Sequence, residues 1–244
     1  MIKKNFLMPS FNTTLVSAYL PIEGYNTKSI DDFIKYAEPF LRLPIPKVIF
    51  IDERFYEILK MVDATYTKYV PITKEDLLLH HKFANASLPN HRNLKKDVND
   101  YFLVINSKPK FLKMASAIDP FETQQFLWVD FGISHVLSNT NVLNSLVRNY
   151  DFGNNLTIAG IWNHDVDIDI KNNVCWVFAG GVFGGTKSAV NKFYGACVSQ
   201  LLDNSSKDFL TWEVNVWYQI YKRNKELFNV YYGSHDDTII TNIP

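Results

Sequence analysis

The sequence predicts an α/β fold whose sheet is mixed, mostly parallel and flanked by helices. Short buried apolar runs alternate with segments of helical periodicity, which is the pattern of repeated β–α–β units. A length of 244 residues with 47% apolar residues suits one domain with a sizeable core. Neither a repeat nor a Pro/Ser-rich linker divides the chain, so we expect one domain over residues 1–244.

The first part of the chain predicts three strands and two helices. The strands are apolar, β-branched runs that end at a proline or an acid, at 14–20, 47–52 and 67–71. The helices, at 29–41 and 54–62, carry apolar residues three and four positions apart.

The middle of the chain predicts two helices, at 94–106 and 109–117, joined at residues 106–108. Pro109 then stands at a first helical position, where its missing N–H costs nothing. A strong strand follows at 126–130, where four apolar residues run into Asp130 before Gly132.

The last part predicts strands at 156–162, 174–179 and 228–232, and amphipathic helices at 188–202 and 210–221. The first of these helices has apolar residues at i, i+3, i+4, i+7 and i+11 from Val190.

Charge and cysteine content exclude several classes of protein. Lys and Arg number 25, as do Asp and Glu, so the chain lacks the basic excess of a nucleic-acid-binding protein. The two cysteines, Cys175 and Cys197, form neither a disulfide framework nor a zinc cluster and indicate a reducing compartment. Without a signal-peptide core or a run of 18 apolar residues, we expect a cytoplasmic protein with no membrane span.

Two predicted strands end on an acid, Asp52 and Asp130. Ligands of open α/β sheets bind beyond the carboxyl ends of the strands. Asp130 followed by Gly132 suits a divalent ion, or it caps the following turn.

The glycine-rich segment 179–188 has two interpretations. Thr186 precedes Lys187, so the segment is not a P-loop, and it contains no G-x-G-x-x-G. Its glycines either let the backbone cradle a ligand at the start of the next helix or belong to a bulged strand with a tight turn.

Other acids and aromatic residues leave alternatives open. Asp165, Asp167 and Asp169 depart from the EF-hand pattern and favour the exposed face of a strand. Glu213 lies on an aromatic-rich helix face, as a general base or at the helix margin. His235 offers a nitrogen ligand or belongs to a solvated tail. The aromatic residues, 15% of the chain, fill the core and can also stack on sugars or nucleobases.

Hydrolases with a nucleophilic serine or cysteine are not indicated. The chain contains no G-x-S-x-G motif, and neither cysteine has a histidine nearby in the sequence.

Four segments together resemble one family. Residues 106–112 (NSKPKFL), 126–135 (FLWVDFGISH), 180–185 (GGVFGG) and 232–237 (YGSHDD) occur in the order seen in HtrL/YibB-like bacterial proteins. That family is similar to glycosyltransferases with a GT-A fold, and the resemblance runs from about Thr14 to the end. It implies a single GT-A-like domain that transfers a sugar from a nucleotide-sugar donor, with uracil as the base, to a surface polysaccharide or similar glycan.

The resemblance also implies roles for individual residues. Asp130 and His235 would hold Mn²⁺ or Mg²⁺ against the donor diphosphate, and Lys108 would neutralise phosphate or contact the donor sugar. The nucleoside would meet Ser17, Tyr19 and Asp52, and the wall near the transferred sugar would include Gly180, Gly181 and Gly185. If the enzyme inverts, Glu213 or Asp236 would accept the proton of the acceptor hydroxyl.

One departure from the wider GT-A pattern favours a second interpretation of the function. A typical member has D-x-D where this chain has Asp130-Phe131-Gly132. The HtrL-like proteins share this single acid. The alternative is a non-catalytic glycan-binding or glycan-assembly protein that retains the fold.

Overall fold

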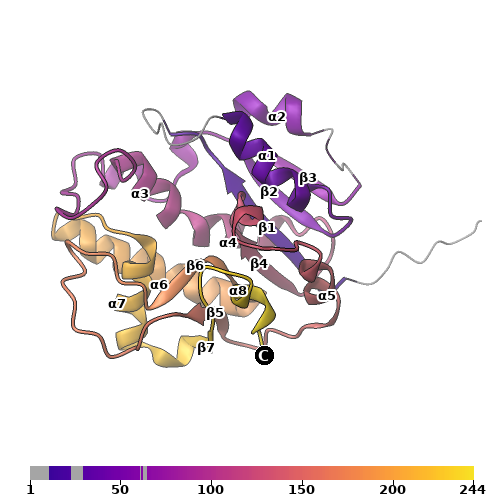
Figure 1. The fold of residues 1–244 in the computed structure, drawn as a ribbon. Coiled ribbons are helices and arrows are strands. Elements are labelled where there is room, and N and C mark those ends of the chain that lie inside the picture. The colour runs from indigo at the N-terminus through magenta and orange to yellow at the C-terminus, as the bar shows by residue number, and fades with distance from the viewer. Residues whose placement is uncertain (1–10, 23–29, 61, 63–64) are drawn as a thin grey trace, which may run out of the picture.

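The computed structural model describes residues 11–22, 30–60, 62 and 65–244, so Ser29, the first residue of the predicted helix 29–41, lies outside the described residues. Seven strands form one sheet in the order β3-β2-β1-β4-β6-β5-β7 (Figure 1). Their bounds are β1 Thr13–Tyr19, β2 Lys47–Asp52, β3 Thr67–Ile72, β4 Gln125–Val129, β5 Leu156–Gly160, β6 Phe178–Thr186 and β7 Phe228–Tyr232.

The sheet is mixed and mostly parallel, as the sequence predicts. Strands β3, β2, β1 and β4 pair in parallel, as do β5 and β7. Strand β6 lies between β4 and β5 and is antiparallel to both. The predicted fold class, an α/β fold with a mixed and mostly parallel sheet flanked by helices, is confirmed, and its likeness to the GT-A fold stays a prediction.

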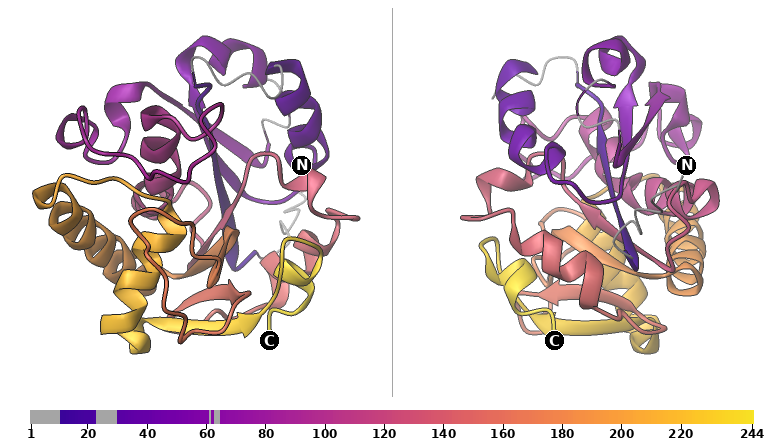
Figure 2. Two further views of the ribbon diagram at one scale, coloured as in Figure 1. Left: turned by 60° about the vertical axis from the view of Figure 1, so that its left-hand side comes forward. Right: turned by 90° about the vertical axis from the view of Figure 1, so that its right-hand side faces the viewer.

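Helices cover both faces of the sheet (Figure 2). On one face, α3, α4, α6 and α7 pack an apolar core that includes Phe102, Phe111, Phe193 and Trp217. On the other face, α1, α2, α5 and α8 pack a second core. Their bounds are α1 Ile30–Leu41, α2 Glu53–Leu59, α3 Asn99–Asn106, α4 Lys108–Ile118, α5 Val142–Asn149, α6 Lys187–Ser206, α7 Glu213–Arg223 and α8 Thr238–Thr241.

The glycine-rich segment is a strand and not a loop at the start of a helix. Gly180 to Gly185 lie inside β6, so the predicted strand 174–179 is wrong at both ends: residues 174–177 are not in a strand, and β6 runs from Phe178 to Thr186. A Cβ at Gly184 would lie 2.2 Å from the carbonyl oxygen of Phe126, so only glycine allows β6 to approach β4 this closely. Of the two interpretations, the strand is confirmed.

Several other boundaries differ from the prediction. Helix α3 begins at Asn99 because residues 93–98 form turns closed by the Asp97 carboxylate, which accepts from the backbone N–H of Asn93. Helix α7 begins at Glu213, after buried residues 210–212 that have no regular secondary structure. Helices α5 and α8 were not predicted.

The alternating acids at 165–169 are exposed, as expected, while Val166 and Ile168 pack against the core. The segment is an irregular loop and not a strand. Its position follows from the Tyr218 hydroxyl, which donates to the carbonyls of His164 and Val166 at 3.1 and 2.8 Å.

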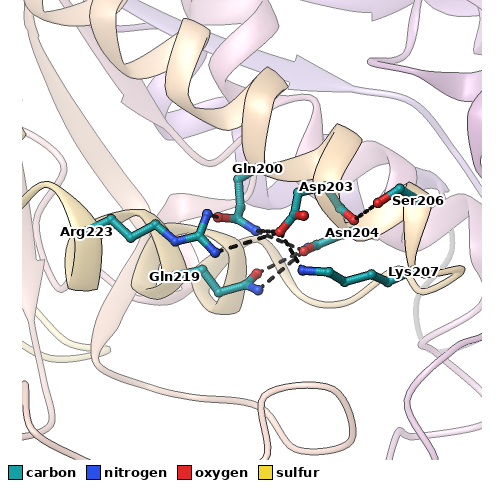
Figure 3. A network of polar contacts seen from close by, with 7 residues as sticks. All are labelled: Gln200, Asp203, Asn204, Ser206, Lys207, Gln219 and Arg223. Carbon is teal, nitrogen blue, oxygen red and sulfur yellow. Dashed lines mark hydrogen bonds and ion pairs between the residues drawn. The ribbon is translucent and has the colours of Figure 1, made fainter.

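A polar network joins the last turns of α6 to α7 (Figure 3). Asn204 is fully buried and exchanges amide hydrogen bonds of 3.1 and 3.3 Å with Gln219. Arg223 donates to the Oε1 atom of Gln200 at 3.1 Å. The network fixes α7, whose first residue, Glu213, belongs to the candidate site described below.

Among the described helices, none combines the length and apolar character needed to cross a bilayer.

Candidate functional site

A cavity of about 500 Å³ lies at the edge of the sheet where β1 and β4 end. Because β6 is antiparallel to β4, its first residues lie at this same edge. The amino ends of α4 and α7 also reach it. The cavity therefore collects Tyr19, Lys108, Asp130, Gly180 and Glu213, which are far apart in the sequence.

Lys108 is the centre of the polar part of this cavity. Its Nζ atom lies 3.0 Å from Asp130 Oδ1, 3.0 Å from Glu213 Oε1 and 3.0 Å from the carbonyl oxygen of Gly180. Burial alone would lower the pKa of Lys108, but the carboxylates of Asp130 and Glu213 outweigh it and raise that pKa. The buried ammonium therefore stays charged.

Asp130 is held in one orientation. Its Oδ1 atom accepts from Trp128 Nε1 at 2.7 Å, and its backbone N–H donates to the carbonyl of Gly181 at 2.9 Å. The Trp128 ring is itself fixed between the rings of Phe111 and Phe183. The side chain of Asp130 is 39% exposed, against 9% for Lys108, so this carboxylate faces the open part of the cavity.

The glycines at the start of β6 leave room for the two carboxylates. A Cβ at Gly180 would lie 2.6 Å from Glu213 Oε1, a distance that side chains do not tolerate. A Cβ at Gly181 would lie 3.7 Å from Asp130 Oδ2. Glycine at 180 therefore lets Glu213 reach Lys108.

Aromatic side chains form the opposite wall. Tyr19 and Phe131 stack with centroids 4.9 Å apart and an interplanar angle of 12°. Burial, with a further contribution from Asp52 against an opposing one from Arg54, raises the pKa of Tyr19 to about 12, so its hydroxyl is neutral at physiological pH. Tyr19 is 7% exposed and Phe131 is 5% exposed, so the pair presents a small, uncharged aromatic surface to the cavity.

The segment after β7 places His235 at the cavity. Its ring meets Trp176 edge-on, with centroids 4.8 Å apart. Partial burial lowers the pKa of His235, against opposing contributions from Asp130 and Glu213. The segment is attached to the body of the protein, because Gly233 donates to the carbonyl of Gly160 at 3.1 Å and Asp237 accepts from the backbone N–H of Ser138 at 2.7 Å.

Four of the predicted site residues lie outside this cavity. Ser17 is fully buried inside β1. Gly185 packs against the side chain of Ala189 and the backbone carbonyl of Asn155. Asp236 is exposed and accepts from the backbone N–H of Thr238 at 2.9 Å.

Asp52 is the fourth. It caps α2 and accepts from Arg54 through three hydrogen bonds, which hold its pKa below the usual range. It faces a smaller cavity of about 270 Å³ that shares residues 20–22 and Val104 with the larger one.

Several residues that line the larger cavity were not predicted as site residues from the sequence. They are aromatic or basic side chains whose neighbours come from distant segments: Tyr36, Lys96, Tyr101, Trp128, His135 and Trp176. Trp128 alone carried a signal, since it lies two positions before Asp130 on the same strand face.

The described residues include no group of three or more His, Cys, Asp and Glu placed to hold a metal ion. Asp130 and His235 offer one carboxylate and one imidazole, a donor pair that Mn²⁺ accepts. Such ions often complete their coordination with water and substrate phosphates. Two donors do not make a dedicated protein cage, and an ion shared between this pair and a phosphate ligand stays a prediction.

A family model described as "Bacterial protein of unknown function (HtrL_YibB)" matches residues 72–240. The chain belongs to the HtrL/YibB family. The part matched includes Lys108, Asp130, Gly180, Glu213 and His235, and leaves out β1 and α1. The predicted family is thus confirmed, and its relation to glycosyltransferases stays a prediction.

Two solved structures resemble this HtrL/YibB protein at low identity. One is 4-diphosphocytidyl-2C-methyl-D-erythritol synthase from Anaerococcus prevotii, with 14% identity, a TM-score of 0.42, and coverage of 96% of this chain and 92% of that one. The other is the inositol-1-phosphate CTP transferase of T. maritima, with 12% identity, a TM-score of 0.41, and coverage of 90% and 84%. No curated protein matches the sequence.

Proposed function

We propose that this HtrL/YibB protein is a glycosyltransferase that moves a sugar from a UDP-sugar to a hydroxyl group of a glycan. The observation that carries the proposal is the cavity itself. It combines aromatic lining residues with a buried ammonium held between two carboxylates, at the sheet edge where α/β folds bind their ligands. The choice of uracil rests on the resemblance of the motifs to glycosyltransferases.

The aromatic wall supports binding of a nucleoside. A nucleobase is flat and apolar on its faces, and it packs well against rings that are already fixed in place. Tyr19 and Phe131 line the cavity without a charge, and a base would contact the part of these largely buried rings that faces the cavity. Asp52 lies at the adjoining smaller cavity, and Arg54 donates to both of its carboxylate oxygens. The ribose would therefore contact only the part of this carboxylate that Arg54 leaves open.

The charges of the polar cluster determine what a diphosphate would need. Lys108 contributes one positive charge and Asp130 and Glu213 contribute two negative ones, so the cluster is net negative. That balance disfavours a diphosphate alone. A divalent ion held by Asp130 and His235 would supply the positive charge that stabilises the leaving diphosphate.

In the transfer, the bond between the sugar and the diphosphate breaks and an acceptor oxygen bonds to the same sugar carbon. The acceptor hydroxyl must lose its proton, and in an inverting reaction we assign this proton to Glu213. Lys108 and Gly180 hold that carboxylate at the cavity. Asp236 is the weaker candidate because it lies outside the cavity and Thr238 lowers its pKa.

The proposal is tested by incubating the protein with UDP-, GDP- and CMP-sugars in the presence of Mn²⁺ and measuring free nucleotide. We expect the parent protein to release UDP. When an acceptor is present, Glu213→Gln should no longer release UDP. No turnover of any donor, together with no thermal shift from any nucleotide, would contradict the proposal and favour the non-catalytic glycan-binding or assembly protein. Release of pyrophosphate from a nucleoside triphosphate would instead indicate a nucleotidyltransferase.

A further inference from the structure

Three aromatic residues lie side by side at the sheet edge next to the cavity. Gly160 of β5 is in register with Tyr232 of β7 on one side and with Phe178 of β6 on the other. Two residues beyond Gly160, the backbone N–H of Trp162 donates to the carbonyl of Trp176 at 3.1 Å. Trp162, Trp176 and Tyr232 therefore occupy neighbouring positions, and together they are called the aromatic strip below.

Of the three residues, only Tyr232 lies within a strand. Side chains two positions apart on a strand point to the same face, so Tyr232 shares the face of Val230, which packs against the core under α6 and α7. Trp162 follows the end of β5 at Gly160, and Trp176 lies in the turn before β6 begins at Phe178, so the hydrogen bond between their backbones is what places these two side by side.

The strip is open to solvent although it is aromatic. Trp162 is 39% exposed and Tyr232 is 73% exposed, and both are among the few large apolar residues that the described surface leaves open. Exposed aromatic residues that gather next to a cavity are typical of a ligand-binding surface.

The strip is continuous with the cavity and is already ordered. Trp176 lines the cavity and contacts His235 there. The loop that follows Trp162 is fixed by the hydroxyls of Tyr218 and Tyr221, which contact His164 and leave little entropy to lose on binding.

We infer that the aromatic strip binds a neutral oligosaccharide and leads its end into the cavity. The C–H faces of sugar rings are apolar and pack on exposed aromatic rings, while their hydroxyls need hydrogen-bond acceptors. Asp165 and Asp167 follow Trp162 closely in the sequence and are exposed, so their carboxylates would supply acceptors and repel an anionic glycan. The role of this oligosaccharide as the sugar acceptor rests on the proposed function, whereas its binding to the aromatic strip does not.

The test uses the whole protein without nucleotide and four hexasaccharide probes. Maltohexaose, cellohexaose and chitohexaose are neutral, and hexagalacturonate is anionic. Binding is measured by saturation-transfer NMR and by titration of tryptophan fluorescence. We expect at least one neutral probe to bind and hexagalacturonate not to bind. In Trp162→Ala and in Tyr232→Ala the dissociation constant should rise about fivefold to tenfold.

Matched variants separate the strip from general effects. Ile58→Ala removes another exposed apolar side chain, 62% exposed on α2, and should leave binding unchanged. Trp162→Phe keeps an aromatic face and should restore most of the affinity lost in Trp162→Ala. Tyr232→Ala removes a side chain too exposed to affect folding, so it remains informative if Trp162→Ala does not fold.

The failure of this inference and that of the proposed function give different results. Absence of binding by all neutral probes, or unchanged affinity in Trp162→Ala and Tyr232→Ala, would overturn the oligosaccharide site. A thermal shift with UDP and Mn²⁺ tests the nucleotide site and should be the same in Trp162→Ala as in the parent. Probe binding without any nucleotide binding would retain the strip and contradict the transferase.

Discussion

Replacing Lys108 by methionine should cost much of the stability of this protein. The side chains of Lys108 and Glu213 are each only 9% exposed, and Lys108→Met leaves the Glu213 carboxylate buried without its cation. Removing one partner of a buried ion pair costs about 3–5 kcal/mol. Nearly all of this comes from Glu213, because Asp130 is 39% exposed and recovers water.

The assay is urea unfolding followed by circular dichroism, with thermal melting as a second measure. For a chain of this length the loss corresponds to a fall in Tm of roughly 10 °C. The control is the double variant Lys108→Met/Glu213→Gln, which removes both buried charges and should recover most of the lost stability.

Two results would refute this reasoning. A loss below about 1 kcal/mol in Lys108→Met would mean that the carboxylate finds water or another partner. A double variant as unstable as the single one would mean that methionine disturbs packing and that charge is not the cause.

The raised pKa of Lys108 gives a related expectation: the stability it contributes is present below the usual lysine pKa and is lost as the pH rises through the folded-state value.

Three further predictions concern single side chains. Gly180→Ala should displace the Glu213 carboxylate from Lys108, because the new Cβ would lie 2.6 Å from Glu213 Oε1. We expect this variant to lose turnover in the donor assay while circular dichroism still shows a folded protein. Full activity would contradict the assigned role of Glu213. Asn204→Leu should lower the free energy of unfolding by about 1–3 kcal/mol, since it leaves Gln219 and Gln200 with unmet hydrogen bonds in the network of Figure 3, and an unchanged urea midpoint would show that the network contributes nothing. Asp52→Ala should cost about 1 kcal/mol as a lost helix cap. The folded-state pKa of Asp52 is lowered, chiefly by its hydrogen bond with Arg54. The contribution of Asp52 to the free energy of unfolding is therefore present above the usual aspartate pKa and is lost as the pH falls through the folded-state pKa. Equal stabilities of variant and parent at neutral pH would contradict this prediction.

The sequence was sufficient for elements whose cause is local. The bounds of β2 were predicted to the residue because an apolar run begins at a lysine and ends at an acid that caps the next helix. Asp130 was predicted at the cavity for the same reason, as an acid at the end of an apolar strand.

The sequence was insufficient where the cause is tertiary. The glycines of β6 have low strand propensity, and only the backbone of β4 alongside them explains why a strand forms there. The pairing of Lys108 with Glu213 joins residues 105 positions apart, so no spacing rule reveals it. Asp236 has the composition of a site residue, but its turn with Thr238 directs it away from the cavity.

The most direct test of the proposed function is a crystal structure of the protein with UDP and Mn²⁺. We expect the uracil to lie against Tyr19 and Phe131, and the diphosphate with its ion to lie between Asp130 and His235 in the cavity of about 500 Å³. Density for the nucleotide elsewhere, for example over the exposed acids at 165–169, would contradict the assignment of the site. Crystals that take up neither UDP nor Mn²⁺ at saturating concentration would contradict the transferase itself.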